Sequence, residues 1–460
     1  MLVTTKTEEI LQKQRCFFQT GKTRAIDFRR EALKTLKHLL IADREKILLA
    51  LKQDFNKSNF ESIETELLFC TRQIDYTLKN LKSWIKPDKV PASLFQLPAS
   101  ARIVAEPLGI ILIIGAWNYP VQLTLSPLIS AIAAGNCAII KPSEITSRTS
   151  VAIAHLIGQA FPSEYITVIE GGKDIVRDLI AHKFDRIFFT GSSRVGQIIM
   201  EAAAKHLTPV TLELGGKSPC IIEPDIDLDI TARRVAWGKF LNCGQTCIAP
   251  DYVLIHRSIK TAFLKKIQEK IEQFYGSDPE RSPDYAKIVN DFHFQRLLSA
   301  IEPQKVVIGG KSNAETRYIA PTVMDGVTWD DRIMEEEIFG PILPVLEYED
   351  LEAAIAQINA RPKPLALYLF TNKKKTRERV LQATSSGNVC LNDTLMQIVS
   401  EHLPFGGVGE SGMGTSHGKI GFNTFSHQKS ILQRSFWLDL PLRYPPYTEI
   451  KAKFFNFFLR

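Results

Sequence analysis

The spacing of apolar residues changes along the chain and divides it into regions of different predicted structure. From about residue 5 to 85, apolar residues recur every three or four positions, as in REALKTLKHLLIADREKILLALKQDF, which predicts a series of amphipathic helices. Farther on, short β-rich runs alternate with helical segments, and the predicted strands are GIILIIGAW, CAIIK, YITVIEG and RIFFTGS. Strands that alternate with helices predict an α/β fold with a parallel sheet covered on both faces.

A second α/β segment begins near TLELGGKSPCIIEPDID. It contains DYVLIHR, ALYLFT and GNVCLND, which we expect to be strands, and KTAFLKKIQEKIEQFY, which predicts a long helix. Between the first helices and the first strand lies KPDKVPASLFQLPASARIVAEP, with four prolines. This stretch predicts an extended arm that leaves the compact body.

Composition narrows the class of protein. A chain of 460 residues predicts two or three domains. Its 45% apolar and 23% charged residues are ordinary for a soluble globular protein. The net charge of +7 is spread along the chain apart from Lys373–Lys375, so nucleic-acid binding is not expected. The longest apolar run, Leu108 to Trp117, is too short to span a bilayer.

The N-terminus and the cysteines predict the compartment. The segment MLVTTKTEEILQKQR has neither the apolar core nor the cleavage site of a secretory signal. Seven cysteines form an odd number without a regular framework, which indicates free thiols in a reducing environment. We therefore expect a cytoplasmic protein.

Two predicted strands end in turns that could bind a nucleotide, because ligands of parallel sheets bind at the carboxyl ends of the strands. FFTGSSRVG places Gly191, Ser192 and Gly196 between a strand and the start of a helix, where an anion is favoured. The spacing differs from GxGxxG and from a P-loop, so an ordinary β–α turn remains an alternative. AIIKPSE places Lys141 and Glu144 where they could hold ribose hydroxyls, or form only a surface turn.

Three further acidic or amide groups could take part in catalysis. Glu213 lies between two leucines, and burial would raise its pKa toward that of a base active near neutral pH, unless it faces solvent. Asn118, in WNYP, could donate to a developing oxyanion or be an ordinary turn residue. Three consecutive carboxylates in EEEIFGP usually mark a solvated surface, but the Phe-Gly-Pro turn indicates that one is held in place.

The segment LNCGQTCIAP holds Cys243 and Cys247, for which four interpretations exist: a metal half-site, a disulfide, two core residues, or a nucleophile with a bystander. The spacing does not match the usual zinc motif and no paired histidines accompany it, so no metal is expected. A disulfide within one helical turn is disfavoured in a reducing compartment. Together the motifs favour a thiol that attacks a carbonyl, an amide that holds the oxyanion, a dinucleotide that takes hydride and a carboxylate that activates water.

Eight motifs follow one another in a recognisable order: WNYP, KPSE, FTGS, LELGGKSP, GQTCIAPDY, EEIFGP, NDT and PFGGVGESGMG. In this order the chain resembles the aldehyde dehydrogenase superfamily, from the N-terminal helices to about Lys429. GQTCIAPDY, HGK and FSHQKS are similar to the class 3 branch, which includes fatty aldehyde dehydrogenases.

The resemblance implies a Rossmann-type cofactor domain, an α/β catalytic domain and a small β bridging arm. The expected boundaries are 1–85 and 105–212 for the NAD(P)-binding domain, 213–400 for the catalytic domain, 86–104 and 415–440 for the arm, and 441–460 for a C-terminal tail.

The resemblance also assigns roles to individual residues. The nucleophile falls on Cys247, the general base on Glu213, and the oxyanion donor on Asn118 together with the backbone N–H of Cys247. The expected cofactor-binding residues are Lys141, Glu144, Gly191, Ser192, Gly196, Glu337, Phe339 and Trp117. We expect NAD as cofactor, because Glu144 would bond a free 2′ hydroxyl and repel a 2′ phosphate. NADP is the alternative, since the branch is often permissive.

The chain departs from the class 3 pattern at two positions. Ser416 precedes His417 where the branch often has tyrosine, which puts an aromatic wall at that point in doubt. Cys243 stands where the branch often has serine or alanine. We interpret it as a small packing residue, and a resolving thiol for Cys247 is the alternative.

Residues beside the motifs point to an apolar substrate. Tyr119, Trp237, Met396 and Ile398 are predicted to line a funnel, and no arginine beside the motifs is placed to bind a substrate carboxylate. We expect oxidation of a medium- or long-chain aliphatic, aromatic or isoprenoid aldehyde to the acid. The alternatives are a semialdehyde or CoA-linked enzyme on the same scaffold, and an inactive binding relative.

The C-terminus, KAKFFNFFLR, has four phenylalanines in its last seven residues. An exposed apolar patch of this kind usually marks an interface. It could pack on its own protein, dock on a partner subunit, or make peripheral contact with a membrane. The class 3 branch tends toward dimers, so a homodimer is expected.

Overall fold

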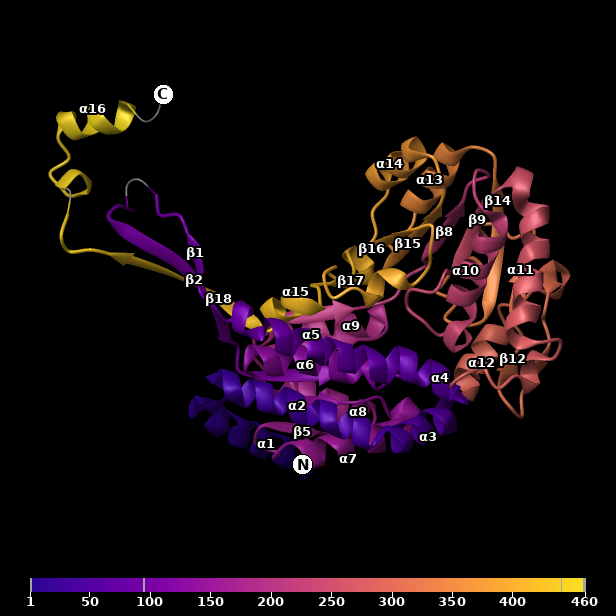
Figure 1. Cartoon of the computed structure of the whole chain (residues 1–460), viewed down its shortest axis with the longest axis horizontal. Coiled ribbons are helices and arrows are strands. Elements are labelled where there is room, and N and C mark those ends of the chain that lie inside the picture. Colours follow the sequence, from indigo (N-terminus) through magenta and orange to yellow (C-terminus); the bar gives the residue numbers. More distant parts are fainter. Residues whose placement is uncertain (1, 94–95, 440, 458–460) are drawn as a thin grey trace.

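The computed structural model describes residues 2–93, 96–439 and 441–457. Figure 1 shows two α/β units side by side and a narrow arm that leaves the first unit on the side away from the second. Each α/β unit has its own sheet and its own cluster of buried apolar side chains.

The first sheet has six strands in the order β17-β7-β6-β3-β4-β5, all parallel to their neighbours except β17. Its central strands are buried on both faces, which explains why their sequences are apolar without alternation. The strands are β3 (Ile110–Ile114), β4 (Cys137–Lys141), β5 (Ile166–Val168), β6 (Arg186–Thr190), β7 (Val210–Glu213) and β17 (Gly412–Met413).

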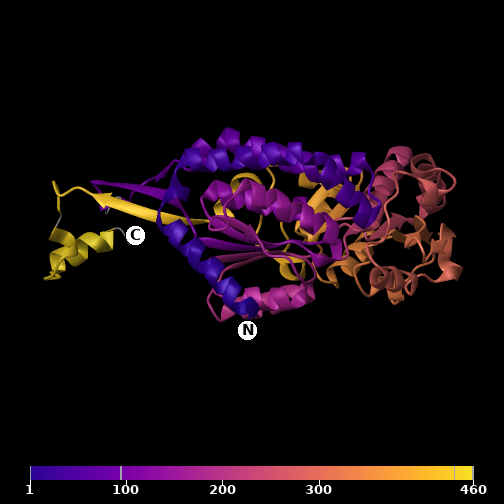
Figure 2. The same ribbon diagram turned by 90° about the horizontal axis from the view of Figure 1, so that it is seen from below.

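Helices cover both faces of this sheet, which is seen nearly edge-on in Figure 2. The predicted helical region near the N-terminus forms α1 to α5, with a π-helical turn at Ile63–Leu67. The helices of this unit are α1 (Leu2–Gln19), α2 (Ile26–Ala42), α3 (Arg44–Phe55), α4 (Asn59–Ser62), α5 (Leu68–Trp84), α6 (Gln122–Ala134), α7 (Ser147–Ala160), α8 (Lys173–Ala181), α9 (Ser193–Ala204) and α15 (Gly418–Thr424).

The second sheet has seven strands in the order β10-β13-β14-β9-β8-β15-β16. Only β10, at one edge, is antiparallel to its neighbour. Its strands are β8 (Pro219–Ile222), β9 (Tyr252–His256), β10 (Val306–Ile308), β13 (Thr322–Met324), β14 (Ile342–Tyr348), β15 (Ala366–Phe370) and β16 (Asn388–Leu391).

The remaining elements of this unit are helices and one small hairpin. The predicted helix KTAFLKKIQEKIEQFY corresponds residue for residue to α11. These elements are α10 (Leu228–Phe240), α11 (Lys260–Tyr275), α12 (Asp291–Leu298), α13 (Leu351–Asn359), α14 (Lys374–Ala383), β11 (Ser312–Asn313) and β12 (Tyr318–Ile319).

The arm is an antiparallel three-stranded sheet in the order β1-β2-β18, formed by β1 (Asp88–Val90), β2 (Ala99–Pro107) and β18 (Ser426–Arg434). The segment 415–440 was expected to belong to the arm, and its strand β18 does join the arm sheet. The helix α15 of the same segment packs instead against α5 and α6 of the first unit. The last helix, α16 (Glu449–Phe457), lies beyond the end of the arm and away from both α/β units (Figures 1 and 2). Within the described ranges, no helix has the length and apolarity needed to cross a membrane.

Candidate active site

A tight turn presents the Cys247 thiol after α10. Asn242 and Cys243 adopt left-handed backbone conformations with φ of 52° and 54°. Such conformations need support from their surroundings. Here Asn242 Nδ2 donates to the Asn118 carbonyl at 2.8 Å, and Gln245 Nε2 donates to the Lys287 carbonyl at 3.0 Å. These bonds, one buried and one partly buried, fix the turn that precedes the thiol.

Cys247 is partly buried, and burial raises the pKa of its thiol well above the usual range. The negative charges of Glu337 and Glu213 raise this pKa further, so both carboxylates lie within electrostatic range of Sγ. Hydrogen bonding by the backbone N–H groups of Cys247 and Ile248 lowers the pKa of the thiol and so acts in the opposite direction. The structure therefore brings together the predicted thiol, the two predicted carboxylates and the N–H group of Cys247.

Cys243 has different surroundings. It is buried in the apolar core of the second unit, and burial raises the pKa of its thiol to about 12, opposed by a hydrogen bond with Tyr285. All seven cysteines are free thiols. In the described part of the chain, no three His, Cys, Asp or Glu side chains gather in a way that could hold a metal ion.

Glu213 ends β7 and is buried. Its backbone pairs with Thr190 on β6 and with Gly412 on β17, which holds the residue from both sides. Burial raises the pKa of its carboxyl to about 7, while a hydrogen bond from Ser416 Oγ to Oε1, 2.5 Å long, opposes that rise. The carboxyl lines a cavity together with Ser416 and His417.

Of the three consecutive glutamates, Glu335 and Glu336 are exposed and Glu337 is partly buried. Burial raises the pKa of Glu337 to about 8, and the nearby Asp251 raises it further. A Cβ at Gly215 would lie 2.0 Å from a Glu337 oxygen, so the glycine makes room for this carboxylate. The sequence prediction that one of the three acids is held in place agrees with this geometry.

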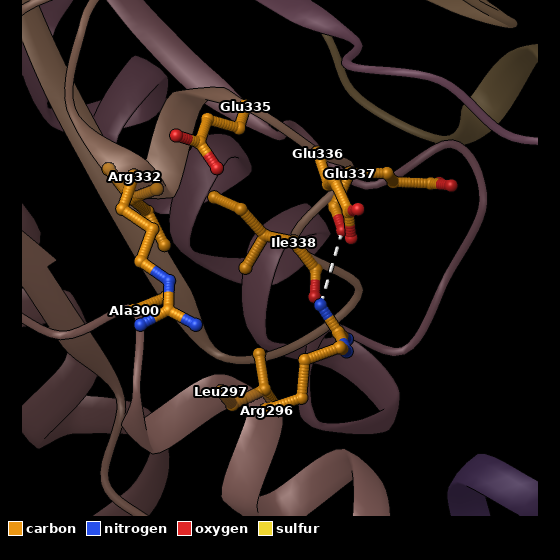
Figure 3. Close-up of a pocket in the computed structure, with 9 residues that line it drawn as sticks. Arg296, Leu297, Ala300, Arg332, Glu335, Glu336, Glu337 and Ile338 are labelled. Carbon is orange, nitrogen blue, oxygen red and sulfur yellow. Dashed lines mark hydrogen bonds between the residues drawn. The ribbon is translucent and has the colours of Figure 1, made fainter.

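A second set of contacts fixes the backbone around Glu337. Lys217 Nζ donates to the Glu336 carbonyl at 2.8 Å and pairs with Asp251, whose other oxygen accepts from the Ile338 N–H at 2.9 Å. Arg296 donates to the Ile338 carbonyl at 2.7 Å and to the Glu337 carbonyl at 3.4 Å, and Figure 3 shows its guanidinium beside both residues. Sequence reasoning missed Lys217, Asp251 and Arg296, although two of them lie in the quoted motifs LELGGKSP and GQTCIAPDY.

Phe339 and Trp117 form an aromatic cluster beside this segment. Phe339 has a φ of 51°, and its ring meets the Trp117 ring edge-on at 5.2 Å between centroids. Trp117 also contacts the rings of Phe55 and His293. The cluster places these two predicted cofactor residues next to each other.

Asn118 is buried, and its backbone carbonyl accepts from Asn242 at 2.8 Å and from Lys57 Nζ at 3.5 Å. Lys57 forms a fully buried ion pair with Glu66, at 3.1 Å. Glu66 also accepts the backbone N–H groups of Val121 and Gln122. This ion pair therefore fixes the loop that carries Asn118, and sequence analysis gave no sign of it, because both residues lie in a region with an ordinary amphipathic pattern.

The other predicted cofactor residues lie at the carboxyl ends of β4 and β6. Lys141 is buried, and its Nζ donates to Glu144 Oε2 at 2.5 Å. Ser192 is at the N-cap of α9 and makes no side-chain bond to that helix, so the first N–H groups of α9 are not capped by it. These residues fit a dinucleotide, with N–H groups for phosphate and a carboxylate for ribose hydroxyls.

Gly191 and Gly196 lie so close to neighbouring side chains that a larger residue would not fit. A Cβ at Gly191 would lie 2.5 Å from the Phe189 ring, and one at Gly196 would lie 3.0 Å from the Leu214 side chain. Steric fit to the protein interior is therefore sufficient to explain both glycines.

The four predicted substrate residues do not share one environment. Tyr119 is buried, with its hydroxyl 2.7 Å from Thr246 Oγ1, and Trp237 packs against the core of the second unit. Met396 is 46% exposed. Ile398 lines the cavity at Glu213.

Comparisons with known proteins agree with this arrangement. The sequence profile of the aldehyde dehydrogenase family matches residues 4–431. Aldehyde dehydrogenase family 3 member A2 of Pongo abelii is 47% identical over 98% of this chain and 93% of its own length. The dimeric NADP-preferring aldehyde dehydrogenase of Canis lupus familiaris is 44% identical over 96% of this chain and 98% of its own length.

A solved structure extends the likeness to three dimensions. The substrate-bound state of Staphylococcus aureus AldH superposes with a TM-score of 0.96 at 45% identity, over 98% of this chain and 99% of that one. The chain belongs to the aldehyde dehydrogenase family.

Proposed function

We propose that this enzyme oxidises apolar aldehydes to carboxylic acids with NAD, and also accepts NADP. The observation that carries the proposal is the convergence of the Cys247 thiol with the carboxylates of Glu213 and Glu337. Family membership supplies the reaction class, and the apolar side chain of Ile398 beside Glu213 supports the substrate class.

The proposed reaction divides between these residues. Cys247 Sγ, once deprotonated, bonds to the aldehyde carbon, and the Asn118 amide with the backbone N–H of Cys247 stabilises the oxyanion. An oxidised nicotinamide held by Glu337, Phe339 and Trp117 would supply the acceptor for the hydride that leaves this carbon, and Sγ would then carry a thioester. Glu213 then takes a proton from water, whose oxygen bonds to the thioester carbon and releases the acid and the thiol.

The same geometry supports the cofactor residues that the family resemblance implies. We assign the adenosine ribose to Lys141 and Glu144, the pyrophosphate to Gly191, Ser192 and Gly196 at the start of α9, and the nicotinamide end to Glu337, Phe339 and Trp117. The Lys141–Glu144 contact of 2.5 Å holds these two side chains together at the carboxyl end of β4, which supports their assignment to one ribose.

An aldehyde panel tests the reaction class and the substrate class together. We expect hexadecanal and benzaldehyde to generate reduced-nicotinamide absorbance without CoA, and succinic semialdehyde to give a lower kcat/KM. We also expect kcat/KM for NAD to exceed that for NADP, because Glu144 repels a 2′ phosphate. No absorbance change with any aldehyde, or a strict need for CoA, would contradict the proposal.

We propose the domain division given by the expected boundaries, except that α15, which packs on the first unit, is not part of the arm: 1–85 and 105–212 for the cofactor, 213–400 for catalysis, 86–104 and 415–440 without α15 for the arm, and 441–460 for the tail. The separate sheets and cores of the two α/β units support it. The free cysteines support a reducing, cytoplasmic location.

We further propose a homodimer in which the arm and the tail contribute to the interface. β18 is nine residues long and pairs only with β2 in the described part of the chain, so its outer edge can accept another strand. Phe436, Trp437, Tyr447 and Ile450 expose large apolar side chains around the end of the arm. The basic side chains of Lys451 and Lys453 favour peripheral membrane contact as the second candidate.

Truncation of the chain after Pro446 distinguishes a role of the tail in the dimer interface from a role in membrane contact. It removes Tyr447, Ile450 and α16, and we expect the dimer to dissociate at higher protein concentration in analytical ultracentrifugation, because apolar interface area is lost. Ile450→Asp should act in the same direction, and Thr448→Ser serves as the matched control. An unchanged dimer with lost co-sedimentation on anionic vesicles would favour membrane contact, and no change in either assay would contradict both roles.

A further inference from the structure

The Ser416 hydroxyl is directed at the carboxylate assigned as general base. Ser416 Oγ donates to Glu213 Oε1 at 2.5 Å, and both side chains are buried. A hydrogen bond to an ionised group in a buried site is stronger than one in water. The contact comes from a residue 203 positions farther along the chain, so it depends on the fold.

The backbone holds Ser416 in position for this contact. Ser416 N–H donates to the Phe405 carbonyl at 2.7 Å, and Phe405 N–H donates back to the Ser416 carbonyl at 3.2 Å. These two bonds form an isolated bridge between the segments. The Oγ atom also lies 3.4 Å from the Phe405 carbonyl, a longer and weaker alternative to the Glu213 contact.

Two other titratable groups face this site. His417 Nδ1 lies 3.5 Å from Ser416 Oγ, and burial lowers the pKa of His417 to about 4, so the imidazole is neutral above pH 5. The Cys247 thiol is within electrostatic range of Glu213, and burial and the nearby carboxylates raise the pKa of that thiol above the pKa of Glu213. Among the described residues, Ser416 provides the side-chain hydrogen bond to the Glu213 carboxyl.

We propose that Ser416 is a positioning residue that orients the Glu213 carboxylate and stabilises its ionised form for thioester hydrolysis. The inference rests on the proposed role of Glu213. It concerns the residue at which this chain differs from the tyrosine often found in the class 3 pattern. A serine hydroxyl adds a short donor here without the bulk of an aromatic ring.

An ester substrate tests this role without added nucleotide. Cys247 Sγ can displace para-nitrophenolate from para-nitrophenyl hexanoate, and water then hydrolyses the same type of thioester, with no change of oxidation state. The burst of nitrophenolate reports acylation of Cys247, and the slower steady phase reports hydrolysis. Both phases are measured from pH 5 to 9 on the full chain, for the wild type, Ser416→Ala and Ser416→Thr.

Removing the donor should disfavour the carboxylate, so the acid limb of the steady phase should move up by about one pH unit in Ser416→Ala. That shift makes hydrolysis about fivefold slower at pH 7 and nearly unchanged at pH 9, with the burst amplitude retained. Ser416→Thr keeps the hydroxyl and should restore the wild-type profile.

The Glu213→Gln variant separates the two hypotheses. If it loses the acid limb while Ser416→Ala overlays the wild type, the role of Ser416 is overturned and that of Glu213 stands. If Glu213→Gln itself keeps the wild-type steady phase, the proposed function of Glu213 fails, and the role of Ser416 fails with it. A Ser416→Ala defect that threonine does not rescue, or that is equal at all pH values, would indicate packing and overturn the inference.

Discussion

Cys247→Ala should abolish aldehyde oxidation, with a loss of kcat of at least about 10⁴-fold, because no other group can form the thioester. The residue is only partly buried, so the truncation creates little cavity strain, and the fold should survive. Reduced-nicotinamide absorbance with hexadecanal measures the loss, and circular dichroism checks that the variant is folded.

Cys243→Ala is the matched control, four residues earlier in the same loop. Its thiol is packed in the core of the second unit, so the variant should keep most activity and lose some stability. Alkylation followed by peptide mapping should find modification at Cys247 that aldehyde or cofactor prevents. If Cys243→Ala were inactive and Cys247→Ala active, the assignment of the nucleophile would be reversed.

Glu213→Gln should slow steady-state turnover by about 10²- to 10⁴-fold, because an amide cannot take a proton from water. Acylation does not need this step. We therefore expect a first-turnover burst of reduced nicotinamide that equals the wild-type burst, followed by a slow steady phase. Stopped-flow absorbance resolves the two, and full steady-state turnover in the variant would show that another group is the base.

The pH dependence supplies an independent check on this residue. Burial raises the pKa of the Glu213 carboxyl to about 7, and only its ionised form can accept a proton. Turnover limited by hydrolysis should therefore fall as the pH drops through about 7. The Glu213→Gln variant should not show this fall. If wild-type turnover fell only near the ordinary pKa of glutamate, the Glu213 carboxyl would be more solvated in the working enzyme.

Much of the fold could be predicted from local sequence alone. The strands β3, β4 and β6 are continuous apolar runs bounded by turns, and α11 has unbroken helical periodicity, so each was recognisable by itself. The strand β14, in the interior of the second sheet, was not predicted. Its sequence ILPVLEY contains Pro344, which normally argues against a sheet interior.

The active site, like the fold, has features that the sequence predicts and features that it does not. Motif order alone identified the family and placed Cys247, Glu213 and Glu337 in one reaction, and family membership is confirmed by the relatives found. The contacts that hold these residues were not predictable. Lys57 lies in the N-terminal helices and supports the Asn118 loop, and Lys217 pairs with Asp251 to fix the Glu337 segment. Such pairs join residues far apart in sequence, and no local pattern records which partner a charged side chain meets.

Local patterns along the chain show which chemical groups are present and in which kinds of element they lie, because periodicity and short motifs are local properties. The pKa values and the orientations of those groups depend on the folded arrangement. Burial at the end of β7 raises the pKa of Glu213, and Ser416 reaches the same carboxyl from a segment that folds back beside it. A pKa depends on the water that the whole fold excludes and on the neighbours that it brings close, and neither is a property of a short stretch of chain.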